Sequence, residues 1–308
     1  MKIVPISDGD RSKNDTWHLF GFIAEIANAN TRNAYYRSCS DFLIWLQERN
    51  LSLQTALPIH VAAWRENLIA KCATATVKLS LAAIRGFYDW LTLRQYVGGN
   101  PALSVKSPRE AVSRGKTTFL EQTEARYLLA SIDCSTVLGM RDRALIALML
   151  FTFARIGAAL NLRCSDITKG AGATWVLLHE KRGKLHEMPL HPQAEDWLLE
   201  YLAKAKTDMT TDLPLFRSYD RKTGLLSERK LHPVNAYAMV KRRARDAGIA
   251  TSICNHSFRA TGITAYLTNG GTLENAALLA NHASTRTTQL YDRRQADTRA
   301  VEVQRISF

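Results

Sequence analysis

Apolar residues recur at helical spacing through the first hundred residues of the chain. Two segments show this pattern most clearly, residues 31–49 and residues 74–91, and each predicts a helix with one apolar and aromatic face. A Gly-Gly-Asn-Pro sequence at residues 98–101 predicts the end of this helical region. We expect both apolar faces to pack in a core: Tyr35, Phe42, Leu43, Trp45 and Leu46 from the first helix, and Leu79, Leu81, Ile84, Phe87, Tyr88 and Leu91 from the second.

The longer second part of the chain mixes helical and strand patterns. The strongly apolar residues 138–153 predict a buried helix, whereas residues 174–180 and 185–190 predict two short strands joined by a glycine-containing turn, as in a hairpin. Further helices are expected at residues 192–205, 233–247, 256–269, 273–280 and 285–293. The pattern therefore predicts a mainly α-helical protein with a small β-hairpin or sheet, in the α+β class.

A basic stretch without periodicity, at residues 105–117, separates the two parts. It carries Lys106, Arg109, Arg114 and Lys116 against the single acid Glu110, with Ser, Pro and Gly interspersed. This composition is typical of an exposed linker. We therefore expect an N-terminal helical domain at residues 1–107, a basic linker at residues 108–117 and a second domain at residues 118–308.

Composition narrows the class of protein. Hydrophobic residues make up 46% of the chain and charged residues 22%, as in a packed globular protein. The longest apolar run, residues 144–154, is too short to cross a bilayer and no signal-peptide pattern opens the chain, so we expect a cytoplasmic protein without membrane contact. The five cysteines form no CxxC pair and the histidines, including the loose cluster His179, His186 and His191, lack metal-ligand spacing. We therefore expect neither disulfides nor a metal or other cofactor.

The formal net charge of +13 points to a polyanionic partner such as DNA or RNA. The basic linker residues form one candidate phosphate-contacting surface. The predicted helix at residues 233–247 forms another, with Lys241, Arg242, Arg243 and Arg245. Contacts of this kind position a protein on DNA without reading its sequence.

Several polar residues of the second part follow or interrupt apolar segments. Arg155 comes directly after the apolar helix, and His256 and Arg259 are three residues apart, which places them on one face of a helix. His282 lies nine residues before Tyr291. Each has an ordinary structural explanation, such as capping of the last helix carbonyls by Arg155. An imidazole beside a guanidinium is also well suited to binding a phosphate.

The order of these residues resembles the signature of the tyrosine recombinases, the phage integrase family. That signature consists of an arginine, a lysine in a β-turn, a His-x-x-Arg pair, a histidine and a tyrosine. The resemblance covers nearly the whole chain. In that family a helical core-binding domain is joined by a linker to a larger catalytic domain, which matches the division expected here. The resemblance implies that the catalytic residues are Arg155, Lys181, His256, Arg259, His282 and Tyr291, with Lys184 as the alternative to Lys181.

Three supporting positions depart from the family pattern. Ala158 stands where the family usually has an acidic residue, three places after the first arginine. Ala260 stands where histidine is frequent, and Asn281 replaces the glycine that usually precedes the last histidine. These changes concern loop geometry and rate more than the reacting groups.

The resemblance implies a site-specific DNA recombinase or integrase. Tyr291 would attack the scissile phosphate to give a 3′-phosphotyrosyl link, while Arg155, Arg259 and His282 stabilise the phosphorane. Lys181 would protonate the 5′-oxygen and His256 would assist proton transfer from the tyrosine, with neither ATP nor metal required. The partners implied are double-stranded DNA and further copies of the chain: a dimer on each site, a homotetramer on two, and strand exchange through a Holliday junction.

Two other functions fit the same residues. A type IB topoisomerase-like enzyme would share the chemistry but only relax DNA. A DNA-binding protein that has lost catalysis would keep the charge but not the reaction. The apolar end of the chain, with Val301, Val303, Ile306 and Phe308, either packs on its own domain or docks on a neighbouring protomer.

Overall fold

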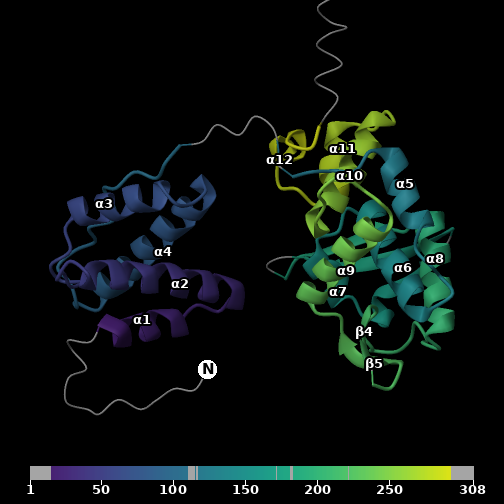
Figure 1. The fold of residues 1–308 in the computed structure, drawn as a ribbon, viewed down its shortest axis with the longest axis horizontal. Helices are drawn as coiled ribbons and strands as arrows, with labels where there is room; N and C mark the ends of the chain where they lie inside the picture. Colours follow the sequence, from purple (N-terminus) through teal and green to yellow (C-terminus); the bar gives the residue numbers. More distant parts are fainter. Residues whose placement is uncertain are drawn as a thin grey trace, which may run out of the picture. The chain divides into compact units, whose positions relative to one another are not determined.

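The computed structural model describes residues 15–109, 115, 117–170, 172–180, 183–220 and 222–292 (Figure 1). The chain divides into two compact units, Met1–Ala111 and Val112–Phe308. The division falls inside the segment that the sequence predicts as a linker. Among the described residues, no helix has the length and apolar character needed to cross a membrane.

The described residues of the first unit form four helices, α1 (Asp15–Ala24), α2 (Ala29–Gln47), α3 (Pro58–Ile69) and α4 (Thr74–Leu93). The Asn28 side chain accepts hydrogen bonds from the first free backbone N–H groups of α2, and Pro58 occupies the first turn of α3. The first residues of α2 and α3 are therefore determined by the local sequence. Of the residues predicted to form the core, nine are buried: Phe42, Leu43, Trp45, Leu46, Leu81, Ile84, Phe87, Tyr88 and Leu91. Tyr35 is partly buried, and the prediction for Leu79 is wrong because this side chain is 43% exposed.

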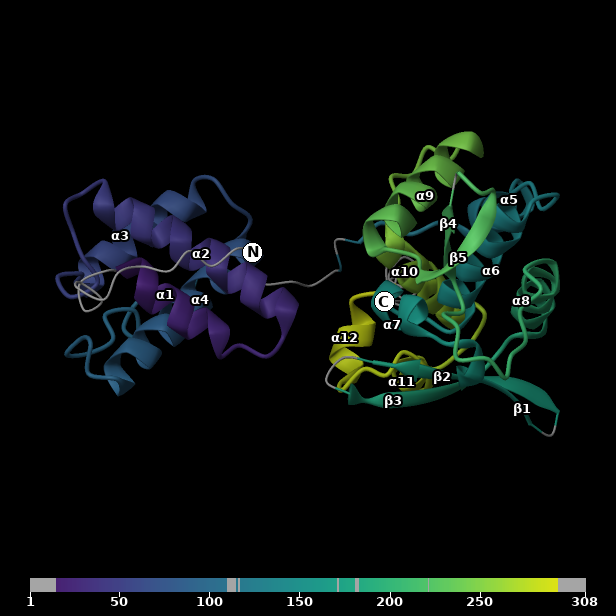
Figure 2. The ribbon, with the colours of Figure 1, turned by 90° about the horizontal axis from the view of Figure 1, so that it is seen from below.

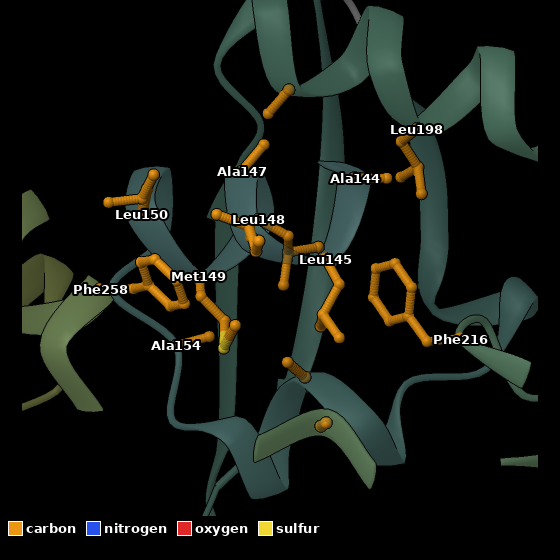
Figure 3. Packing of buried hydrophobic residues seen from close by; sticks show 14 of the residues in the cluster. Ala144, Leu145, Ala147, Leu148, Met149, Leu150, Ala154, Leu198, Phe216 and Phe258 are labelled. Atoms are coloured by element: carbon orange, nitrogen blue, oxygen red, sulfur yellow. The ribbon is translucent and has the colours of Figure 1, made fainter. Parts of the chain in front are cut away.

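The second unit is organised around α6 (Val137–Phe151), which the sequence predicts at residues 138–153. Every residue from position 144 to position 150 of this helix is buried. Figure 3 shows Leu145, Leu148 and Met149 packed among side chains of neighbouring elements, with Phe216 and Phe258 close by. A helical segment that is apolar on all sides is stable only when other elements surround it, and residues 144–150 of α6 are such a segment.

Shorter helices make up most of the rest of the unit: α5 (Gln122–Ala130), α7 (Ile156–Asn161), α8 (Pro192–Lys204), α9 (Pro233–Asp246), α10 (Asn255–Thr268), α11 (Leu273–Leu279) and α12 (Thr285–Gln289). Of these, α5, α7, α8 and α10 pack on α6. The helices α8 and α9 begin alike. Each has proline at its first position and a preceding histidine, His191 or His232, whose ring accepts a hydrogen bond from the backbone. Proline lacks the N–H that a first helical turn leaves unpaired, which favours it at this position.

The described part of the second unit also contains two small antiparallel sheets (Figure 2). The strands β2 (Ala173–His179) and β3 (Leu185–Pro189) form the predicted hairpin, with His179 opposite Leu185, and β1 (Ile167–Gly170) pairs with the other edge of β2. The second sheet, β4 (Arg217–Asp220) with β5 (Leu225–Lys230), was not predicted. The predicted α+β class, mainly helical with small sheets, is confirmed.

Candidate active site

Tyr291, two residues after the end of α12, lies beside three of the predicted site residues, His256, Arg259 and His282. Its phenol oxygen lies 2.8 Å from Nε2 of His256, and its ring stacks on the His282 ring at a centroid distance of 5.9 Å. The backbone carbonyl of Tyr291 accepts a hydrogen bond from Thr264 Oγ1 at 3.0 Å, which ties the residue to α10. The tyrosine is 8% exposed, so it is held in the wall of the site.

Arg259 on α10 is the most buried charged group of the site, at 1% exposure. Its guanidinium donates to the carbonyl of Phe153 and, at 2.5 Å, to the carbonyl of Ala280. These contacts link α10 to the end of α6 and to the end of α11. Burial, with a contribution from Arg155, lowers the pKa of Arg259 to about 10, which leaves it charged at neutral pH.

Two non-glycine residues with left-handed backbone flank these carbonyls. Phe153 has a φ of 54° and Asn281, directly after Ala280, has a φ of 48°. Asparagine adopts this conformation more readily than most residues. Asn281 therefore performs the role that glycine usually has at this position, and that departure from the family pattern leaves the turn before His282 intact.

Both histidines are held in the neutral form. Burial, followed by the charges of Arg259 and Arg155, lowers the pKa of His256. The same causes lower the pKa of His282 to about 4. The Nδ1 atom of His282 lies 2.8 Å from the buried hydroxyl of Thr288. A neutral imidazole can accept a proton, so His256 is able to take one from Tyr291.

Arg155 occupies the residue before α7 and points one guanidinium nitrogen, Nη1, at a carboxylate oxygen of Glu180, 2.5 Å away. Its side chain is 42% exposed, and that of Glu180 is 4% exposed. Arg155 does not cap the last carbonyls of the apolar helix, because its hydrogen-bond partner is the carboxylate of Glu180. Sequence reasoning missed Glu180.

Strand periodicity could have identified Glu180. Thr174, Val176 and Leu178 alternate as the buried positions of β2, and Glu180 continues the alternation just past the strand. A carboxylate at a buried strand position requires a hydrogen-bonded or charged partner.

This geometry can be compared with known proteins. The model of the phage integrase family matches residues 118–298, more than half of the 308 residues, and the model of the phage integrase N-terminal SAM-like domain matches residues 22–95. The chain belongs to the phage integrase family. The sequence-based prediction of this family is confirmed.

Relatives cover most of this phage integrase family member. The tyrosine recombinase XerD of Pseudomonas aeruginosa is 29% identical over 269 residues, which are 85% of this chain and 86% of the relative. The tyrosine recombinase XerC of Yersinia pestis is 28% identical over 217 residues, 70% of this chain and 68% of the relative.

Solved structures share the fold. The XerH site-specific recombinase bound to difH substrate matches with a TM-score of 0.69 at 19% identity, over 97% of this chain and 99% of that chain. A lambda integrase tetramer bound to a Holliday junction matches with a TM-score of 0.64 at 15% identity, over 89% of this chain and 75% of that chain.

The hairpin lysine of this integrase family member stays a prediction. Lys181 lies outside the described residues, so no contact of its side chain enters the site description. The alternative, Lys184, is exposed, and its carbonyl accepts a hydrogen bond from the Glu180 N–H at 2.7 Å. Gly183, with a φ of 73°, supplies the left-handed residue of this turn.

The predicted DNA-contacting residues have differing surroundings. Lys106 and Arg109 are exposed, whereas Arg114 and Lys116 lie outside the described residues. On α9, Arg245 is 77% exposed and pairs with Asp246, and Lys241 contacts the Ser252 hydroxyl.

Arg242 and Arg243 on α9 have a partner that the sequence did not indicate. Both donate to the carboxylate of Asp142 on α6, which is fully buried and also pairs with Arg141. The Arg243 side chain is 17% exposed and that of Arg242 is 44% exposed. Part of the basic charge of α9 is therefore used to hold this helix on the core, and the DNA-contacting role of these residues stays a prediction.

The three histidines of the loose cluster each have another contact. His179 pairs with Asp166, His186 contacts the carbonyl of Leu279, and His191 caps α8. Within the described ranges, no group of three or more His, Cys, Asp or Glu side chains is arranged to hold a metal ion.

Proposed function

We propose that this protein is a site-specific DNA recombinase that cuts and rejoins DNA through a covalent bond to Tyr291. The observation that carries the proposal is the 2.8 Å contact between the Tyr291 phenol and the neutral His256 imidazole, beside Arg259. A phenol has a reference pKa of about 10 and needs a proton acceptor to become a nucleophile at neutral pH. His256 supplies that acceptor.

The cleavage step balances as a transesterification. The Tyr291 oxygen forms a bond to phosphorus as its proton passes to Nε2 of His256, and the bond from phosphorus to the 5′-oxygen breaks. That oxygen takes a proton from Lys181, or from Lys184 as the alternative. The products are a 3′-phosphotyrosyl link and a free 5′-hydroxyl. Because the ester energy is kept in the protein–DNA bond, rejoining needs no ATP.

The phosphorane intermediate carries extra negative charge, and fixed cationic donors are the usual way to stabilise it. Arg259 is immobilised by the Phe153 and Ala280 carbonyls, so its charge is already oriented before DNA arrives. Arg155 is more exposed and adds a second guanidinium from the residue before α7. Neutral His282, oriented by Thr288, adds a hydrogen bond. Because these groups neutralise the charge, the reaction needs no metal ion, and we expect full cleavage when EDTA removes divalent ions.

We further propose the domain roles and the assembly. Residues 1–107 would form the core-binding domain, residues 108–117 the linker and residues 118–308 the catalytic domain, acting on DNA in the cytoplasm. The solved lambda integrase tetramer on a Holliday junction supports by analogy a homotetramer on two double-stranded sites, with one dimer on each. The DNA-contacting residues proposed for the linker are Lys106, Arg109, Arg114 and Lys116, and those for α9 are Lys241, Arg242, Arg243 and Arg245.

The test uses two DNA substrates that carry the target site of this chain, called here the core site and located by covalent trapping on fragments tiled across the DNA that flanks its gene. A linear pair of sites that yields recombinant joints supports the proposal. Supercoiled circles that are only relaxed would instead identify the topoisomerase-like function, and tight specific binding without cleavage would identify a catalytically silent binder.

A further inference from the structure

Glu180 is a buried carboxylate at the edge of the active site whose role the proposed reaction leaves unexplained. The residue follows β2 directly, on the strand's buried face, and its side chain is 4% exposed. Its backbone N–H donates to the Lys184 carbonyl at 2.7 Å, which fixes the residue where the hairpin turn begins. Both the backbone and the burial of Glu180 are thus determined by the sheet.

Arg155 is the more exposed member of the pair. Its side chain is 42% exposed and long, and holding such a side chain in one rotamer costs conformational entropy. The recorded contact joins Nη1 of Arg155 to Oε2 of Glu180 at 2.5 Å. The buried carboxylate is therefore the fixed partner of this contact, and it restricts the rotamers of the exposed arginine.

The contact leaves most of the guanidinium available. An arginine has five N–H donors in a planar fork, and the recorded bond uses one nitrogen. The remaining donors can bind phosphate oxygens while Nη1 stays on Glu180. The carboxylate also acts on Arg259, whose pKa it raises slightly against the lowering by burial and by Arg155.

We propose that Glu180 is a positioning residue that holds Arg155 for the scissile phosphate. Ala158 lacks the carboxylate that the family usually has three places after this arginine, and Glu180 supplies a carboxylate to Arg155 from the hairpin instead. This inference rests on the proposed recombinase function. It gives the hairpin a second role, since the turn that carries the predicted lysine general acid also fixes the first arginine.

The test measures single-turnover cleavage of nicked duplexes that carry the core site, with DNA affinity measured in parallel. Glu180→Ala should lower the cleavage rate between about 10-fold and 100-fold, approaching the loss of an oxyanion donor, with affinity changed less than about threefold. Glu180→Gln keeps an acceptor oxygen and the side-chain shape, so its loss should be about tenfold or less. Glu187→Ala, an exposed glutamate on β3 of the same hairpin, is the matched control and should cleave normally.

A double-mutant cycle separates positioning from a general structural effect. In an Arg155→Ala background, Glu180→Ala should cause less than a twofold further loss, because the group that it positions is already gone. Equal losses in both backgrounds, or wild-type cleavage by Glu180→Ala, would overturn the inference. Absence of a Tyr291–DNA adduct with the wild-type chain would contradict the proposed function itself, which distinguishes the two failures. If Glu180→Ala does not fold, Glu180→Gln carries the same cycle.

Discussion

Arg259 is expected to stabilise the fold as well as to catalyse, so replacing it with alanine should damage both. The substitution leaves the buried carbonyls of Phe153 and Ala280 without their donors. An unsatisfied buried polar group costs about 2 kcal/mol, so the two together cost about 4 kcal/mol. For a unit the size of Val112–Phe308, each kcal/mol lowers the melting temperature by about 2–4 °C. The expected decrease is therefore about 8–16 °C.

Tyr291→Phe is the matched control for this prediction. It abolishes the same reaction but leaves Arg259 on both carbonyls, and the phenol's lost hydrogen bond to His256 is worth about 1 kcal/mol or a melting shift of about 2–4 °C. Thermal unfolding of the full chain by circular dichroism, following the transition of the second unit, measures both variants. A melting temperature for Arg259→Ala no lower than that of Tyr291→Phe would refute the structural role of Arg259. Cleavage should be compared below the lower of the two transitions.

Three further predictions follow from other contacts. Asp142→Ala leaves the buried Arg141 without its carboxylate and should lower the free energy of unfolding in urea by about 3–5 kcal/mol. The control Asp246→Ala removes an exposed carboxylate and should lower it by less than about 1 kcal/mol. Similar losses in the two variants would contradict the role of the buried network. Thr288→Val removes the hydroxyl that orients His282 and should slow cleavage about tenfold with unchanged DNA affinity. An unchanged cleavage rate would show that Thr288 does not orient the ring. The pKa of His282 falls from 6.5 to about 4 on folding, so the unfolded chain binds the proton first as the pH falls. The free energy of unfolding should therefore decrease as the pH falls from 6.5 towards 4, by about 1 kcal/mol at pH 5 after solvent screening. His282→Asn should show a weaker pH dependence in urea unfolding.

The predicted elements that the structure reproduces are those whose signal is local. The apolar helix predicted at residues 138–153 is α6, and the two short alternating segments are β2 and β3. Helix burial and strand alternation both follow from the spacing of side chains along the backbone, which the sequence displays directly. By contrast, β1 has a single buried residue in four and β5 is largely charged, so neither shows an alternating pattern.

The candidate site residues could be predicted from their residue types and their order in the chain. The acidic residues that pair with arginines in the folded protein could not. His256, Arg259, His282 and Tyr291 stand out in the sequence, and the structure brings them together with Arg155. Glu180 and Asp142 did not stand out, because a carboxylate's role depends on which cation the fold brings to it. Arg243 illustrates the converse, since a basic residue on an apparent surface helix pairs with a buried acid.

The most direct measurement is covalent trapping on DNA. The chain is incubated in EDTA with nicked duplex fragments tiled across the DNA flanking its gene, and any adduct is resolved on denaturing gels and mapped by peptide analysis. The proposed function predicts a protein–DNA adduct on Tyr291 that Tyr291→Phe does not form. An adduct on any other residue, or specific binding without an adduct, would contradict it.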